Sequence, residues 1–212
     1  MKLNKTDIAG LILILLMFVT SIYLYPGIPD KIPIHWNAAG EIDGYGSKGL
    51  GLFLLPSIIA GVFGLFILIP KMAVFKKNIE SFMKYFNGMK IVFILFFVGM
   101  YIATTVQIYR PFNISYFIGP ALGAMLFYVG WIMQFVKRNY FIGIRTPWTL
   151  SSDKVWDKTH KLGSLLFRIV AVIMAVSFLF PKYFIWIFLI PLLAMIIWLF
   201  VYSYLEFKKE KV

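Results

Sequence analysis

The sequence predicts an all-α, multi-pass membrane protein with six transmembrane helices and both termini in the cytoplasm. Three observations support this prediction: the composition, the number of long apolar segments, and the uneven distribution of lysine and arginine between the loops. The chain is 61% hydrophobic and 14% charged, with a mean hydropathy of +0.84. Soluble domains are about a quarter charged, and a soluble globule of this size could not bury so much apolar surface. A bilayer must therefore cover it.

Six apolar segments follow one another along the chain. A spanning helix needs about 20 apolar residues, and backbone groups in lipid must bond within their own segment, so each segment predicts a helix. The first segment is longer than a signal-peptide core and no clear cleavage site follows it, so we interpret it as an uncleaved span. The fifth becomes long enough if its helix starts near Val155. The predicted spans are residues 8–25, 50–69, 90–109, 115–136, 164–180 and 184–207.

Positive charge sets the predicted orientation. All but four of the 21 lysines and arginines lie in one set of connections and at the two termini, a set that counts Arg168 near the start of the fifth span. The positive-inside rule places this set, with the 70–89 and 137–163 loops, in the cytoplasm. The same distribution accounts for the net charge of +12. No nucleic-acid-binding module accompanies the charge, so we expect no direct contact with nucleic acid.

Several chemistries are excluded or disfavoured by missing residues. The chain has no cysteine, which excludes disulfides, thiol catalysis and cysteine metal sites. The centres of the predicted spans carry no ionisable residue, which disfavours ion-coupled transport. No nucleophile, base and carboxylate are spaced as a catalytic set, so we expect no enzyme, no cofactor and no metal. Gly119 and Gly123 form a GxxxG pattern, which predicts close helix packing.

The first outer loop, residues 26–48, predicts an ordered cap on the outer membrane surface. Three prolines keep its start extended, and Asp43-Gly44 and Gly46 predict tight turns. His35 and three nearby carboxylates are residue types that bind metals, but their spacing fits no ligand pattern. The density of proline, glycine and aromatic residues is unusual for a free linker, so we expect a compact lid with Trp36 at the interface.

The longest polar stretch, residues 137–163, is the candidate functional region. Gly143 and Pro147 interrupt regular helix in its first half. Ser151 or Ser152 then predicts a helix N-cap, and Asp153 falls in the first turn, where the helix dipole favours an anion. The helix that starts there continues into the fifth span.

Four side chains of this stretch have two interpretations each. Arg145 is suited to a phosphate or carboxylate of a ligand or partner, or to lipid phosphate and helix carbonyls. Trp148 and Trp156 form a recognition surface in one interpretation and an ordinary membrane-interface belt in the other. His160 is a proton carrier or a histidine hydrogen-bonded within the fold. We expect Arg145, the two tryptophans and His160 to form one pocket or docking surface.

The motifs in these two regions resemble a known family. The run NYFIGIRTPWT, followed by SxxVWxxTH, resembles the hallmark of the SdpI/YfhL family of bacterial membrane proteins. The outer loop IPDKIPIHWNAAGEIDGYGSK resembles DUF1648, which often precedes that region in the same family. The resemblance covers most of the chain. It singles out as partner-binding or ligand-binding residues Asn139, Gly143, Arg145, Thr146, Pro147, Trp148, Trp156, Thr159 and His160 inside, and Pro29, Pro33, His35, Trp36, Gly40 and Gly44 outside.

The resemblance implies a protein of the bacterial cell membrane that gives immunity against a secreted cannibalism toxin. It also implies a receptor that, when engaged, holds an ArsR-type autorepressor at the membrane. The implied partners are therefore a secreted toxin peptide, a cytoplasmic transcriptional repressor and the lipid bilayer. Two other functions stay open, a transporter or flippase for a lipophilic peptide or lipid, and a membrane enzyme that uses His160 or His35. We divide the chain into a two-helix unit, 1–70, and a four-helix region, 71–212.

Overall fold

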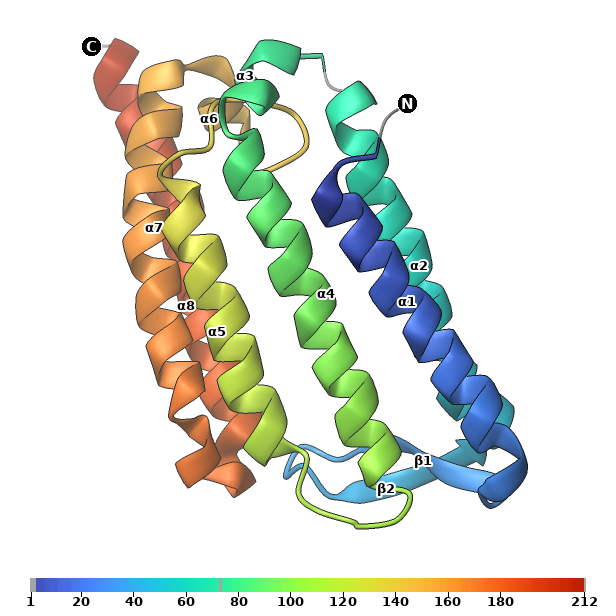
Figure 1. Ribbon diagram of the computed structural model, residues 1–212. Helices are drawn as coiled ribbons and strands as arrows, with labels where there is room; N and C mark the ends of the chain where they lie inside the picture. Colours follow the sequence, from blue (N-terminus) through green and yellow to red (C-terminus); the bar gives the residue numbers. More distant parts are fainter. Residues whose placement is uncertain (1–2, 73, 212) are drawn as a thin grey trace.

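Six long helices stand side by side in the computed structural model, which describes residues 3–72 and 74–211 (Figure 1). Within these described residues, six helices are long and apolar enough to cross a membrane, which confirms the predicted number. Both ends of the chain lie at one end of the bundle, and a β-hairpin covers the opposite end. The long helices are α1 (Lys5–Leu24), α2 (Lys48–Met72), α4 (Met83–Val106), α5 (Ser115–Met133), α7 (Asp153–Ala175) and α8 (Phe184–Lys211).

The fifth span begins early, as the sequence analysis expects. The hydroxyl of Ser152 accepts a hydrogen bond from the amide of Val155, so Ser152 is the N-cap of α7, and Asp153 lies in its first turn. Arg168, which was counted with the cytoplasmic cations, lies inside α7, within the predicted fifth span. Its Nε donates to the carbonyl of Ser164 one turn earlier, so the side chain bends toward the helix start.

The helices pack in two groups of three. In one group, α1, α2 and α4 bury Ile14, Ile59, Phe63 and Ile94 between them. In the other, α5, α7 and α8 meet around a second apolar cluster. A Cβ at Gly123 of α5 would lie 2.7 Å from the carbonyl oxygen of Ala171 of α7, so this glycine allows the close approach expected of the GxxxG pattern. The division of the chain into residues 1–70 and 71–212 stays a prediction. The packing groups differ from it in one helix, since α4 packs with α1 and α2.

A two-stranded antiparallel hairpin forms the cap, with β1 (Lys31–Trp36) and β2 (Ile42–Ser47). These strands were not predicted from the sequence, and the tight turns expected at Asp43-Gly44 and Gly46 were wrong. Both glycines lie within β2, where their missing side chains leave room for His35 and Ile34 of β1. The reversal occurs at residues 37–40 instead. The hairpin rests on the helix ends through an apolar cluster of Ile28, Ile32 and Leu52.

The opposite end of the bundle carries two short helices and the long polar stretch. Helix α3 (Lys76–Ser81) follows α2, and α6 (Pro147–Ser151) precedes α7. Three 3-10 turns, η1 (Tyr25–Gly27), η2 (Ser177–Leu179) and η3 (Pro181–Tyr183), complete the connections. The fold therefore presents one β-capped end and one end built from the polar stretch between α5 and α7.

Candidate functional site

The polar stretch begins with a turn that is organised by Asn139. This side chain is buried, and its Oδ1 accepts hydrogen bonds from the amides of Phe141 and Ile142, each at 2.8 Å. Its Nδ2 donates to the carbonyls of Lys137 and Ile142 at 2.8 and 3.0 Å. All of these partners belong to the stretch itself. The contacts of Asn139 therefore shape the backbone and leave no polar group facing outward.

Trp156 and His160 form a buried stack below this turn. Their ring centroids lie 4.0 Å apart with an interplanar angle of 17°. The indole Nε1 of Trp156 donates to the carbonyl of Val136 at 2.7 Å, and the amide of Ile144 donates to Nε2 of His160 at 3.0 Å. Because Nε2 accepts a hydrogen bond, the imidazole is neutral, and its Nδ1–H donates to the carbonyl of Trp156 at 2.8 Å. The histidine is hydrogen-bonded within the fold, as one of its two interpretations requires.

Gly143 lies directly on this stack. Its φ is +116°, in a region that side-chain-bearing residues rarely adopt. A Cβ there would lie 2.4 Å from Nε2 of His160 and 3.1 Å from the ring of Trp156. The glycine thus permits both the backbone turn and its contact with the rings.

The next residues attach the stretch to α8. Thr146 is the N-cap of α6, and its hydroxyl lies 3.0 Å from the hydroxyl of Ser203. Pro147 occupies the first turn of α6, where its missing amide proton costs nothing. Trp148 packs against Phe200 and Tyr204, with centroid distances of 4.9 and 5.1 Å. The indole of Trp148 therefore packs α6 against α8.

The structure separates the residues that were expected to form one pocket. Trp156 and His160 are interior and Trp148 is half-buried against α8. Arg145 is exposed, and its guanidinium donates to the carbonyl of Tyr140 within the same stretch. Thr159 is buried, and within the described part of the chain its hydroxyl has no hydrogen-bond partner. A role of these residues in partner binding stays a prediction, and Arg145 is the member best exposed to a partner.

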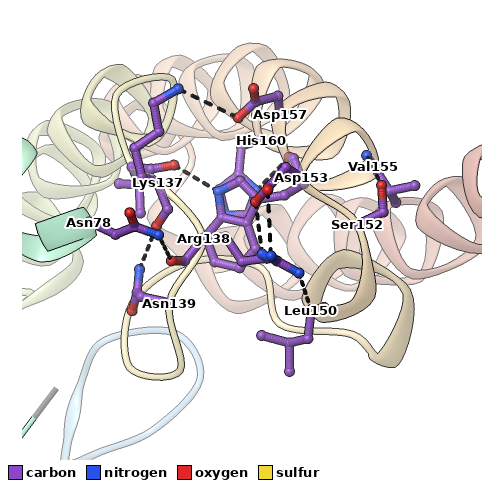
Figure 2. A network of polar contacts seen from close by, with 12 residues as sticks. Asn78, Lys137, Arg138, Asn139, Leu150, Ser152, Asp153, Val155, Asp157 and His160 are labelled. Carbon is purple, nitrogen blue, oxygen red and sulfur yellow. Dashed lines mark hydrogen bonds and ion pairs between the residues drawn. The ribbon is translucent and has the colours of Figure 1, made fainter. Parts of the chain in front are cut away.

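Arg138, which the sequence analysis did not single out, holds the stretch in place (Figure 2). Its Nε lies 2.8 Å from Oδ1 of Asp153 at the start of α7, and its Nη1 donates to the carbonyl of Leu150 at 2.8 Å. The carbonyl of Arg138 accepts from Asn78 of α3 at 2.7 Å. Arg138 thus connects its loop to α3, to the end of α6 and to the start of α7. Its place beside the motif residue Asn139 was only a weak indication of a structural role. A single sequence does not show that Arg138 pairs with Asp153.

At the other end of the molecule, the tip of the hairpin is bonded to the loop before α5. Gly40 has φ +80°, and its carbonyl accepts from the amide of Ile114 at 3.0 Å. The side chain of Asn113 donates to the carbonyl of Ala39 at 2.7 Å. A Cβ at Gly40 would lie 2.1 Å from the hydroxyl oxygen of Ser115, so only glycine fits here. The hairpin is therefore a docked lid and not a free loop.

The predicted outer residues divide between the two faces of the hairpin. Trp36 donates through Nε1 to the side-chain oxygen of Gln107 at the end of α4, at 2.6 Å. His35 is 69% exposed in its side chain, and its Nδ1 lies 2.6 Å from the carboxylate of Asp43 across the hairpin. Pro33 is buried in β1, whereas Pro29 is exposed before it. Gly44, as described above, pairs with His35.

A hollow of about 620 Å³ lies between the hairpin tip and the ends of α5 and α8. His35, Trp36 and Gly40 line it on the hairpin side, and Ser115 and Phe184 line it on the helix side. The hydroxyl of Ser115 is fully buried and has no hydrogen-bond partner within the described residues. The hollow thus combines an apolar floor, an exposed histidine–aspartate pair and an unused hydroxyl. Among the described residues, no cluster of three or more His, Asp or Glu side chains is arranged to hold a metal.

Comparisons with known proteins match both regions. Residues 12–60 match a domain of unknown function, DUF1648, and residues 136–204 match the SdpI/YfhL protein family. The chain is 30% identical over 206 residues to a protein of Bacillus subtilis (strain 168) named "Immunity protein SdpI", with 97% of each chain covered. No solved structure matches the chain. The first matched segment contains the hairpin and the second contains the polar stretch with Arg138, Trp156 and His160.

Proposed function

The chain belongs to the SdpI/YfhL family of membrane proteins, and from this premise we propose that it protects the bacterium that carries it against a secreted toxin peptide. The observation that carries the proposal is the similarity along 97% of both chains with a relative named as an immunity protein. Similarity of this extent includes the hairpin, all six long helices and the polar stretch. Protection is therefore proposed for the whole molecule and not for one motif.

The outer hollow is the proposed contact site for the toxin. It lies at the end of the molecule that the distribution of positive charge assigns to the outside, where a secreted peptide arrives. Its volume of about 620 Å³ accommodates several side chains of a peptide. His35 and Asp43 offer an exposed polar pair, and the aromatic ring of Trp36 offers apolar contact area.

The polar stretch is the proposed exit for a signal. Arg145 is exposed, and the main partner of its guanidinium is a carbonyl of its own loop, so the side chain is available to an acidic surface. An ArsR-type autorepressor held there when the toxin is bound would connect protection to gene expression. Such a receptor needs two conformations with different affinity for the repressor.

Protection is tested by expression in a toxin-sensitive bacterium that is then challenged with the cannibalism toxin of the family and with spent medium from the host strain. Survival above that of the empty-vector strain is expected with at least one of the two. His35→Ala and Ile185→Ala, on the hairpin side and the helix side of the hollow, are expected to lower survival at normal membrane abundance, because neither side chain is buried. Tyr45→Ala is the matched control, because Tyr45 is exposed on the same hairpin and does not line the hollow. No gain in survival with either challenge would contradict the proposal.

The signalling part has its own test. A fluorescent fusion of an ArsR-type repressor encoded beside the gene is expected to move to the membrane when toxin is added. Arg145→Glu is expected to leave the fusion in the cytoplasm while toxin protection persists. A repressor that stays cytoplasmic with the native protein would restrict the function to protection.

A further inference from the structure

A basic hollow lies at the end of the bundle that carries both termini, on the side of α7 that the candidate site does not use. Its volume is about 500 Å³, and it opens along α7 between the end of α5 and the last turns of α8. The polar residues of its wall are Gln134, Lys158, Lys161, Ser164, Arg168 and Tyr202. Three of these six side chains are cations, and no acidic side chain lines the hollow.

Two of the three cations are not neutralised. Lys158 pairs with Glu206 of α8, which also pairs with Lys209. Asp157, one turn before Lys161, pairs instead with Lys137. Within the described part of the chain, neither Lys161 nor Arg168 has an acidic partner.

Arg168 is unusual because of its depth. It lies within α7, which is one of the six candidate spans, and among the described residues its guanidinium bonds only through Nε, to the carbonyl of Ser164 at 3.0 Å. An arginine in a span is costly and normally marks a functional contact. Its side chain runs toward the start of α7, so the guanidinium lies closer to the membrane surface than its Cα does. The two free amino groups of the guanidinium are then available to a ligand from the headgroup region.

Ser164 supplies a second, independent observation. The residue is only 3% exposed, it lines the hollow, and its hydroxyl has no hydrogen-bond partner within the described residues. A buried hydroxyl without a partner costs about 1–3 kcal/mol. A phosphate oxygen in the hollow would accept the missing hydrogen bond.

The hollow continues into an apolar groove. Leu165 and Arg168 line both spaces, and the groove extends deeper along α7 past Ile169, Val172 and Ile173, with Phe127 of α5 as its other wall. Its volume is about 370 Å³. Basic residues near the surface followed by an apolar groove toward the membrane centre match the two parts of a phospholipid, its phosphate and its acyl chain.

We propose that the hollow binds one anionic phospholipid, with its phosphate between Lys161, Ser164 and Arg168 and an acyl chain in the groove of α5 and α7. The lipid would neutralise the two unpaired cations and give the hydroxyl of Ser164 a partner. Its acyl chain would also fill the exposed apolar groove between α5 and α7.

The test uses the purified full-length protein in a neutral detergent. Phosphatidylglycerol is expected to raise the melting temperature and to remain bound as one molecule in native mass spectrometry. Phosphatidylcholine is the control for the acyl chains, and sn-glycerol 3-phosphate is the control for the phosphate alone. Neither control is expected to raise the melting temperature or to remain bound, because the proposed site needs a net negative headgroup and an acyl chain in one molecule. A toxin is not involved, so this result is independent of the immunity proposal.

Substitutions locate the site. Lys161→Gln and Arg168→Gln are each expected to lower the affinity for phosphatidylglycerol about tenfold, which is the size of a charge-assisted hydrogen bond. Lys208→Gln removes the same charge from an exposed position outside the hollow and is expected to change nothing. Ser164→Ala is expected to weaken lipid binding while the lipid-free protein melts no lower, since an unpaired buried hydroxyl is removed.

Three outcomes would overturn the proposal. Equal binding of phosphatidylcholine would show an apolar groove without headgroup recognition. Equal stabilisation by glycerol 3-phosphate would show a free-phosphate site. An equal loss of affinity in Lys208→Gln and Lys161→Gln would show general attraction between surface charge and anionic lipid.

Discussion

The backbone of Gly143 lies against the imidazole of His160, where a Cβ would be 2.4 Å from Nε2. The same nitrogen accepts a hydrogen bond from the amide of Ile144, the residue that follows the glycine. The loop therefore both covers the ring and bonds to it. Two motif residues that are 17 positions apart in the sequence act here as one structural contact.

Gly143→Ala is expected to destabilise the protein by about 1–3 kcal/mol, the usual cost of adding a methyl group where there is no room. The positive φ of Gly143 adds strain to this overlap. The measurements are membrane abundance and the melting temperature of the purified protein. Gly61→Ala is the control, because nothing lies within 4 Å of a Cβ at that position. Equal melting temperatures for the two variants would contradict the expected contact.

The sequence alone was sufficient for the six long helices and for some of their ends, but not for the short helices α3 and α6. Spans are predictable because the membrane imposes a length of about 20 apolar residues on each of them. The N-cap at Ser152 was predictable because a hydroxyl next to a helix start bonds locally. Both signals depend on neighbours in sequence.

The partners of the polar side chains were not predictable in this way. Arg138 and Asp153 are 15 positions apart, and their residue types fit many other pairings. The glycines of β2 indicated turns by local preference, yet tertiary contact with β1 determined their conformation. Arg145 and Trp156 were expected to line one pocket, but Arg145 is exposed and donates to the carbonyl of Tyr140, whereas Trp156 is buried and donates to the carbonyl of Val136.

Gly40→Ala is expected to release the hairpin from α5. The new Cβ would lie 2.1 Å from the hydroxyl oxygen of Ser115, and the φ of +80° would be strained as well. The measurement is the rate at which an external protease cleaves residues 26–48 in intact cells, which should rise. Gly27→Ala is the control, since it lies in the same loop with open space around it. An unchanged rate would argue against a docked lid.

The ion pair between Asp7 of α1 and Lys90 of α4 is buried, with side-chain exposures of 7% and 2%. Lys90→Met is expected to cost about 3–5 kcal/mol, because it leaves an unpaired buried carboxylate. The double variant Asp7→Asn/Lys90→Met is expected to recover most of this loss, since asparagine still accepts the hydrogen bond from the amide of Asn4. Melting temperatures provide the comparison, with Lys84→Met as an exposed control on α4. If the double variant is as unstable as the single one, the carboxylate is not the cause.

Lysine substitution distinguishes the two arginines of the polar stretch. Arg138 contacts Asp153 and the carbonyl of Leu150 at once, a geometry that a lysine cannot reproduce, so Arg138→Lys is expected to lower membrane abundance. Arg145→Lys is expected to accumulate normally, because Arg145 is exposed and bonds within its own loop. A loss of repressor recruitment in Arg145→Lys, with protection kept, would then report on partner binding. Lower abundance of Arg145→Lys than of Arg138→Lys would mean that Arg145, and not Arg138, stabilises the fold.

The orientation in the membrane can be tested with single cysteines, since the native chain has none. Tyr45 on the hairpin and Ser151 at the end of α6 are both exposed and lie at opposite ends of the bundle (Figure 1). Tyr45→Cys is expected to react with a membrane-impermeant maleimide in intact cells, because the positive-inside rule puts the hairpin outside. Ser151→Cys is expected to react only after the cells are opened. Labelling of Ser151→Cys in intact cells, with Tyr45→Cys protected, would invert the orientation and place the outer hollow out of reach of a secreted toxin.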